Sequence, residues 1–142
     1  MKAPAAPARV CLPIREEWDV AVARSRAREL ALSHGFPEAR AAAVATAVSE
    51  VTRNIVVHAG TGELVLEVAS ERGRHAILVV ARDGHPGIPD VDAAMRDGYS
   101  TSAGLGLGLP SAKRLMDEFT LLSAVGRGTT VTMKKWAHDR DG

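Results

Sequence analysis

The chain has 142 residues, of which 46% are hydrophobic and 25% are charged, and its formal net charge is +1. This length and composition fit one globular domain with its own core and exclude a chain that is disordered by composition. The near-neutral charge argues against nucleic-acid binding as the main function, because such binding usually needs a strongly basic surface. The single cysteine, Cys11, excludes an internal disulfide and a multi-cysteine metal site. We expect it to be a small apolar residue in a strand.

No segment has the continuous apolar character of a signal-peptide core or a membrane span. We therefore expect a cytoplasmic protein with no membrane partner. The expected organisation is a flexible N-terminal segment over residues 1–9, one domain over residues 10–137 and a short tail over residues 138–142.

The first half of the chain predicts a short strand and two helices. The strand runs from Val10 to Arg15 and is broken by Pro13. A helix follows from Glu16, where acidic residues suit a helix start, and it stops at Gly35. Pro37 suits the first position of a second, long helix. Its apolar stripe recurs at helical spacing and should face the core: Val44, Val48, Val51 and Ile55.

The second half predicts mainly strands. Residues 64–69 and 76–80 read as a hairpin joined through residues 72–74, and a long loop runs from residue 83 to about 102. A helix over residues 109–119 and two closing strands around residues 126–128 complete the chain. This order predicts an α+β two-layer sandwich, in which helices cover one face of a mixed, largely antiparallel sheet.

A glycine-rich run precedes the last predicted helix. Gly104, Gly106 and Gly108 alternate with leucines, and glycines without Cβ atoms let a backbone approach a ligand closely. If this turn opens a helix, the unpaired N–H groups and the helix dipole favour a phosphate. Such a run, taken alone, is also typical of a flexible connector.

Two polar residues on the second predicted helix form a further candidate site. Glu50 and Asn54 lie four residues apart, so they project from the same side, with Arg53 beside them. A carboxylate can take a proton from a hydroxyl or a water, and an amide oxygen can ligate Mg²⁺. The same pair also fits the polar face of an ordinary amphipathic helix. Arg53 could contact a phosphate or a partner, or could simply be solvated.

The third candidate is Asp83 at the end of an apolar strand, followed by Gly84, His85, Pro86 and Gly87. A carboxylate at a strand end can accept a hydrogen bond from an exocyclic amine, and the Gly-Pro pattern holds a tight loop. Taken alone, this segment is also typical of an ordinary turn.

In this order the three motifs resemble the GHKL family, the ATP-binding domains shared by histidine kinases, DNA gyrase, the mismatch-repair ATPase and the ninety-kilodalton heat-shock chaperone. Glu50 with Asn54 is similar to its N box, residues 83–87 to its first glycine box, residues 104–108 to its second, and Gly128-Thr129 to its closing Gly-Thr. The other histidines, His34, His58, His75 and His138, are expected to be surface or turn residues.

A closer resemblance is to the stressosome serine/threonine switch kinases of that family. It covers nearly all of the chain beyond residue 9 and is carried by the runs 49–55, 97–102, 104–110 and 113–119, with Trp18 and Trp136 near the two ends.

The resemblance implies a serine/threonine protein kinase that uses ATP and Mg²⁺. It implies Glu50 as catalytic base, Asn54 as Mg²⁺ ligand, Asp83 as the carboxylate that recognises adenine, and Thr129 as a hydroxyl near the adenine. The remaining expected nucleotide-binding residues belong to the glycine boxes and to the lid between them: Gly87, Ser100, Thr101, Gly104, Leu105, Gly106, Leu107 and Gly108. Phosphoryl transfer needs mostly positioning and charge neutralisation, which such a set can provide.

The implied substrate is a STAS-domain scaffold or antagonist protein, and the implied second partner is a PP2C-type phosphatase or another output enzyme that the released kinase activates. One departure from the family pattern is His85, which stands where a glycine is usual. It keeps open a non-catalytic partner-switching module with a weakened ATP site. An anti-sigma-factor kinase of the same family is the other alternative.

Overall fold

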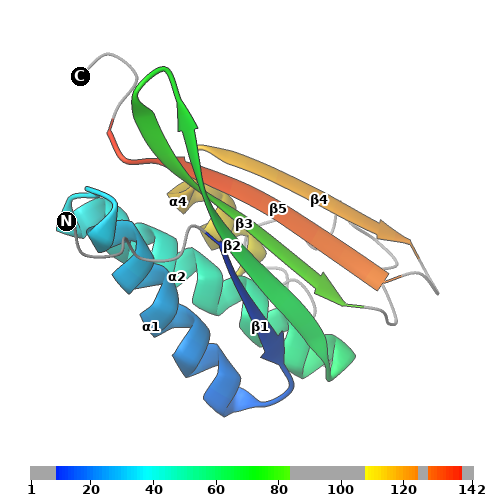
Figure 1. The fold of residues 1–142 in the computed structure, drawn as a ribbon. Coiled ribbons are helices and arrows are strands. Elements are labelled where there is room, and N and C mark those ends of the chain that lie inside the picture. Colours follow the sequence, from blue (N-terminus) through cyan, green and yellow to red (C-terminus); the bar gives the residue numbers. More distant parts are fainter. Residues whose placement is uncertain (1–8, 84–107, 125–127, 139–142) are drawn as a thin grey trace.

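The computed structural model describes residues 9–83, 108–124 and 128–138, and these residues form two layers, with the helices gathered on one face of a five-stranded sheet (Figure 1). The strands are β1 (Arg9–Ile14), β2 (Gly62–Glu71), β3 (Arg74–Asp83), β4 (Glu118–Ala124) and β5 (Gly128–Trp136). The helices are α1 (Glu17–Ser33), α2 (Glu38–Asn54), the π-helical turn η1 (Ile55–Ala59) and α4 (Leu109–Leu115). The predicted two-layer α+β fold is confirmed.

The sheet order is β1-β2-β3-β5-β4, and every pairing between these strands is antiparallel. The sheet was expected to be mixed, and its described part has no parallel pair. Helix α2 packs against both α1 and α4, so it lies in the middle of the helical layer. Helix α2 also contacts β3 and β5, so it packs on the sheet beside α4.

The core lies between the layers. One row of side chains crosses the whole sheet, because Val10, Leu66, Val79, Met133 and Phe119 are successive cross-strand neighbours. The predicted stripe of α2 packs onto this face, and all four of its members are buried. Burying such side chains contributes roughly 1.5 to 3 kcal/mol each to the free energy of unfolding.

Two expectations at the sheet edges were wrong in detail. Pro13 does not break the first strand, because β1 is an edge strand and a residue there can lack a ladder N–H. The last helix ends at Leu115 rather than Phe119, since the backbone at Met116 is already extended and Phe119 lies in β4. Cys11 lies in a strand as expected, but it is exposed.

The β2–β3 hairpin closes through a two-residue turn. Arg72 and Gly73 both have positive φ, at 51° and 79°. Such turns match the twist of the strands that they join. Glu71 consequently pairs with Arg74, and the same ladder runs without interruption to the pair Gly62 and Asp83 at the other end of the hairpin.

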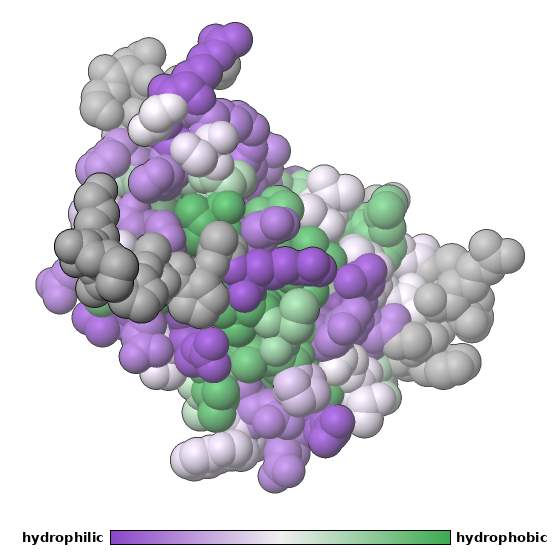
Figure 2. Space-filling view, viewed as in Figure 1, coloured by the Kyte–Doolittle hydropathy of each residue, from purple (hydrophilic) through white to green (hydrophobic). Residues whose placement is uncertain are grey.

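The face of the sheet opposite the helices is partly apolar. Cys11, Val65, Val80 and Thr132 form one outward-facing row across β1, β2, β3 and β5. Figure 2 shows hydrophobic surface at the middle of the view with hydrophilic residues around it. Among the described residues, no helix is both long enough and apolar enough to cross a membrane.

Candidate functional site

Three of the predicted site residues meet at a small cavity. Asn54 is the last residue of α2, Asp83 the last of β3, and Thr129 the second of β5. The cavity measures about 20 Å³, which is enough for one water molecule. The described residues that line it are Val51, Asn54, Ile55, His58, Ala81, Asp83, Leu109, Thr129 and Val131. The sheet, α2 and α4 therefore enclose one pocket with mostly apolar walls and a few polar side chains. Because it is so small, a purine could enter only if the walls moved apart.

Asp83 and Thr129 are held together by the sheet itself. They are cross-strand partners in the β3–β5 ladder, and the Asp83 Oδ1 accepts a hydrogen bond from the Thr129 backbone N–H at 3.3 Å. The Thr129 hydroxyl lies 2.8 Å from the Ser123 hydroxyl, and Thr129 is only 8% exposed. The Asp83 carboxylate is thus held beside an apolar pocket, where it can accept a hydrogen bond from an exocyclic amine.

Asn54 is oriented by its own helix. Its Nδ2 donates a hydrogen bond to the Glu50 backbone carbonyl at 3.0 Å, which fixes the donor end of the amide. The amide oxygen is a ligand of the kind that Mg²⁺ prefers. Among the described residues, no cluster of three or more histidines, cysteines or carboxylates could hold a metal ion by itself. A magnesium ion at Asn54 would therefore need oxygen ligands from the nucleotide and from water, which is how Mg²⁺ usually binds with phosphates.

Glu50 lies one helical turn before Asn54 and faces the start of α4. Its side chain is 26% exposed, and its Oε1 lies 3.7 Å from Nη1 of Arg53. Gly108, the residue that precedes α4, has φ of +78°, and a Cβ atom built there would collide with the Glu50 carboxylate, whose Cδ would lie only 2.7 Å away. Only glycine lets the backbone come so near to this carboxylate.

His58 lines the cavity, although the sequence suggested an ordinary surface or turn residue. The spacing in the sequence could have indicated this position, because His58 follows Asn54 by four residues and the helical backbone continues through η1. Residues four apart on a helix lie on the same side. Leu109 is another wall residue that sequence patterns did not single out. It is fully buried and packs where α4 begins.

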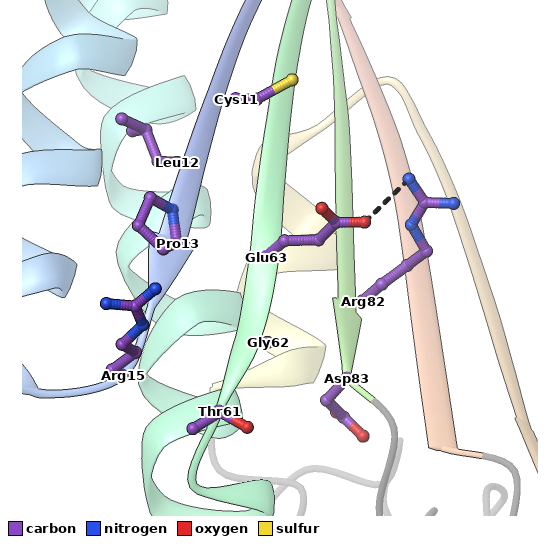
Figure 3. Close-up of a pocket in the computed structure, with 9 residues that line it drawn as sticks. All are labelled: Cys11, Leu12, Pro13, Arg15, Thr61, Gly62, Glu63, Arg82 and Asp83. Atoms are coloured by element: carbon purple, nitrogen blue, oxygen red, sulfur yellow. Dashed lines mark ion pairs between the residues drawn. The ribbon is translucent and has the colours of Figure 1, made fainter.

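A larger hollow of about 620 Å³ lies beside the same strand ends and is lined by β1, β2, β3 and the residues next to them (Figure 3). The outward-facing Glu63 and Arg82 form an ion pair there, at 3.1 Å. Asp83 borders both hollows, whereas Glu50 and Asn54 do not line this larger one. Asn54, Asp83 and Thr129 consequently meet at the small pocket, whereas Glu50 lines neither hollow.

The other predicted nucleotide-binding residues lie outside the described residues, as does His85. They are Gly87, Ser100, Thr101, Gly104, Leu105, Gly106 and Leu107.

Comparisons with known proteins show the family to which the chain belongs. Residues 12–135 match the family described as "Histidine kinase-like ATPase domain". The serine/threonine-protein kinase RsbT of Bacillus subtilis is 46% identical over 126 residues, which cover 89% of this chain and 95% of that protein. The anti-sigma F factor of Geobacillus stearothermophilus is 32% identical over 99 residues, 65% of this chain and 66% of its own length. The anti-sigma F factor of Caldanaerobacter subterraneus is 30% identical over 97 residues. The resemblance inferred from the motifs is confirmed.

Proposed function

The chain belongs to the histidine kinase-like ATPase family, and from this premise we propose that it is an ATP-dependent protein serine/threonine kinase of a partner-switching module. The observation that carries the proposal is the meeting of Asn54, Asp83 and Thr129 around one pocket, with Glu50 one turn away. The similarity to a serine/threonine-protein kinase over 89% of the chain supports the same activity.

In this proposal each described residue has one role. Asp83 accepts a hydrogen bond from the adenine amine, and the Thr129 hydroxyl lies beside it. The apolar walls from α2, β3 and α4 hold the ring. Asn54 would hold Mg²⁺, whose charge would neutralise the phosphate oxygens.

Glu50 is the proposed base. It accepts the proton from a serine or threonine hydroxyl of the substrate protein while that oxygen forms a bond to the γ-phosphorus. The bond between the γ-phosphorus and the bridging oxygen breaks, and ADP leaves with that electron pair. The Glu50 side chain is about a quarter exposed, so a hydroxyl of a substrate protein can reach it.

The proposed substrate is a STAS-domain scaffold or antagonist, and the proposed second partner is a PP2C-type phosphatase or another output enzyme. Both follow from the resemblance to the stressosome switch kinases. The reaction would take place in the cytoplasm, where ATP is available.

Two alternatives remain from specific observations. An anti-sigma-factor kinase is favoured by the relatives named anti-sigma F factor, each of which matches about two thirds of its own length. A non-catalytic partner-switching module is favoured by His85 at a position where the family has glycine.

The deciding experiment incubates the full chain with labelled ATP, Mg²⁺ and a purified STAS-domain protein, with and without a purified sigma factor. Label on a serine or threonine of the STAS protein supports the kinase, and it should disappear with Glu50→Gln. Stable binding of the sigma factor in the same assay would favour the anti-sigma-factor alternative. STAS binding without any label would contradict the kinase proposal and favour the non-catalytic module.

A further inference from the structure

A second polar hollow lies on the helical layer, between α1 and α2. It measures about 330 Å³ and is lined by Glu17, Val20, Ala21, Arg24, Ser25, Arg28, Ser49 and Arg53. Six of these residues come from α1 and two from α2. We call this hollow the α1–α2 groove. The groove shares no described lining residue with the small cavity at Asn54, Asp83 and Thr129.

The charge of the groove differs from that of the whole chain. Three arginines and one carboxylate line it, whereas the chain as a whole has a net charge of +1. Arg24 forms no ion pair with any described residue. Arg28 contacts Glu38 at 3.5 Å, but both side chains are at least half exposed, and such pairs contribute little to stability. The groove therefore presents cationic groups that an anionic ligand can engage at small cost.

Arg53 connects this groove to the proposed catalytic base. It lines the groove, and its Nη1 lies 3.7 Å from Glu50 Oε1. Its side chain is 49% exposed, so solvent screens the pair and a competing carboxylate can reach it. One guanidinium with five N–H donors can turn from one carboxylate to another without losing an ion pair.

We propose that the α1–α2 groove docks an acidic segment of the partner protein and that Arg53 is a positioning residue that couples this docking to Glu50. A partner carboxylate in the groove takes Arg53 away from Glu50, which leaves the Glu50 carboxylate to accept the hydroxyl proton. Phosphoryl transfer would then be favoured when the partner is seated. This inference rests on the proposed kinase function and adds the charge of the partner and the route of its effect.

If the partner docks in the α1–α2 groove, charge changes there should alter the KM for the STAS-domain protein. Arg24→Glu should raise the KM for the STAS-domain protein about tenfold, because like charges facing each other disfavour association. ATP affinity should stay as in the parent. Arg72→Glu, at the exposed hairpin turn, makes the same charge change and should leave KM unaltered. Glu17→Gln removes the only carboxylate of the described lining and should lower KM severalfold, which a damaged fold would not do.

If Arg53 restrains Glu50, removing its charge should increase ATP hydrolysis in the absence of a partner. Arg53→Gln should raise ATP hydrolysis without partner severalfold, because water can then use the unrestrained Glu50, while it weakens the response to the STAS protein. Arg53→Lys should restore most of the parent behaviour, since it retains a cation beside Glu50. Thermal denaturation of each variant checks that the fold is intact.

The outcomes distinguish the proposed kinase activity from the proposed docking and coupling. If the parent neither binds nor phosphorylates the STAS protein, the proposed function fails and this inference fails with it. If the parent transfers phosphate and Arg24→Glu has the same KM as Arg72→Glu, only the docking is wrong. If the KM changes occur but Arg53→Gln hydrolyses ATP no faster than the parent, Arg53 contributes to docking alone and the coupling is overturned.

Discussion

Gly108 is the position where backbone geometry and the proposed base depend on each other most directly. Its φ of +78° would strain an alanine by about 1 to 2 kcal/mol. The new methyl group would also overlap the Glu50 carboxylate, which would have to turn to an unfavourable rotamer at a further cost of about 1 kcal/mol. We therefore expect Gly108→Ala to lower the free energy of unfolding by about 2 to 3 kcal/mol, or the melting temperature by about 5 to 10 °C.

The chain provides a control for each contribution. Gly73 has nearly the same φ, +79°, but no atom lies within 4 Å of an added Cβ. Gly73→Ala should therefore show the backbone strain alone. In a Glu50→Ala background the overlap with the carboxylate is absent and only a tight contact with the Cβ of residue 50, at 3.1 Å, remains. Gly108→Ala should there cost less than in the parent and only slightly more than Gly73→Ala.

Chemical denaturation of the four single and double variants measures these differences, and a transfer assay follows the displacement of Glu50. Gly108→Ala should slow phosphoryl transfer more than it weakens ATP binding. If Gly108→Ala destabilised the protein no more than Gly73→Ala in the parent background, the overlap with Glu50 would carry no cost and this prediction would be wrong. A cost that persisted unchanged after removal of the Glu50 side chain would contradict it equally.

Four further substitutions test the pocket and the core. Asn54→Ala should abolish Mg²⁺-dependent ATP binding or transfer, whereas Glu50→Gln should slow transfer and largely retain binding, as measured with a fluorescent nucleotide and a labelled-phosphate assay. Asp83→Ala should lose ATP binding while it remains folded by circular dichroism, and equal binding of ATP and GTP by the parent would contradict the adenine-recognition role. Leu66→Ala, at a fully buried core position, should lower the free energy of unfolding by about 2 to 5 kcal/mol in urea denaturation.

Local patterns predicted the parts of the fold that depend on local physics. The apolar stripe of α2 and the same-side spacing of Glu50 and Asn54 follow from helical periodicity, and the hairpin follows from its turn residues. The end of α4 did not, because Leu115, Met116 and Phe119 are apolar at a spacing that suits a helix as well as a strand. Pairing with β5, which no local pattern encodes, decides for the strand.

For the candidate site, the sequence indicated the individual motifs but not the contacts between them. Each motif could be found in the sequence, but Asp83 and Thr129 are 46 residues apart and their contact depends on the register of two strands. The approach of Gly108 to Glu50 depends on how α4 packs against α2. Tertiary packing sets both of these distances, so they cannot be predicted from the residue types alone.

The β3–β5 ladder has a consequence for how this domain can change in evolution. A shift of one residue would turn Asp83 to the opposite face and would also expose Val79 and Ala81, which are buried. The strand register that buries these core residues is therefore the same register that places Asp83 at the pocket. An insertion inside either strand would lower both the stability of the domain and its recognition of the ligand. The Arg72-Gly73 turn lies at the far end of β3 from Asp83, as Figure 1 shows. Length variation among descendants of this chain should therefore concentrate at that turn and avoid the two strands.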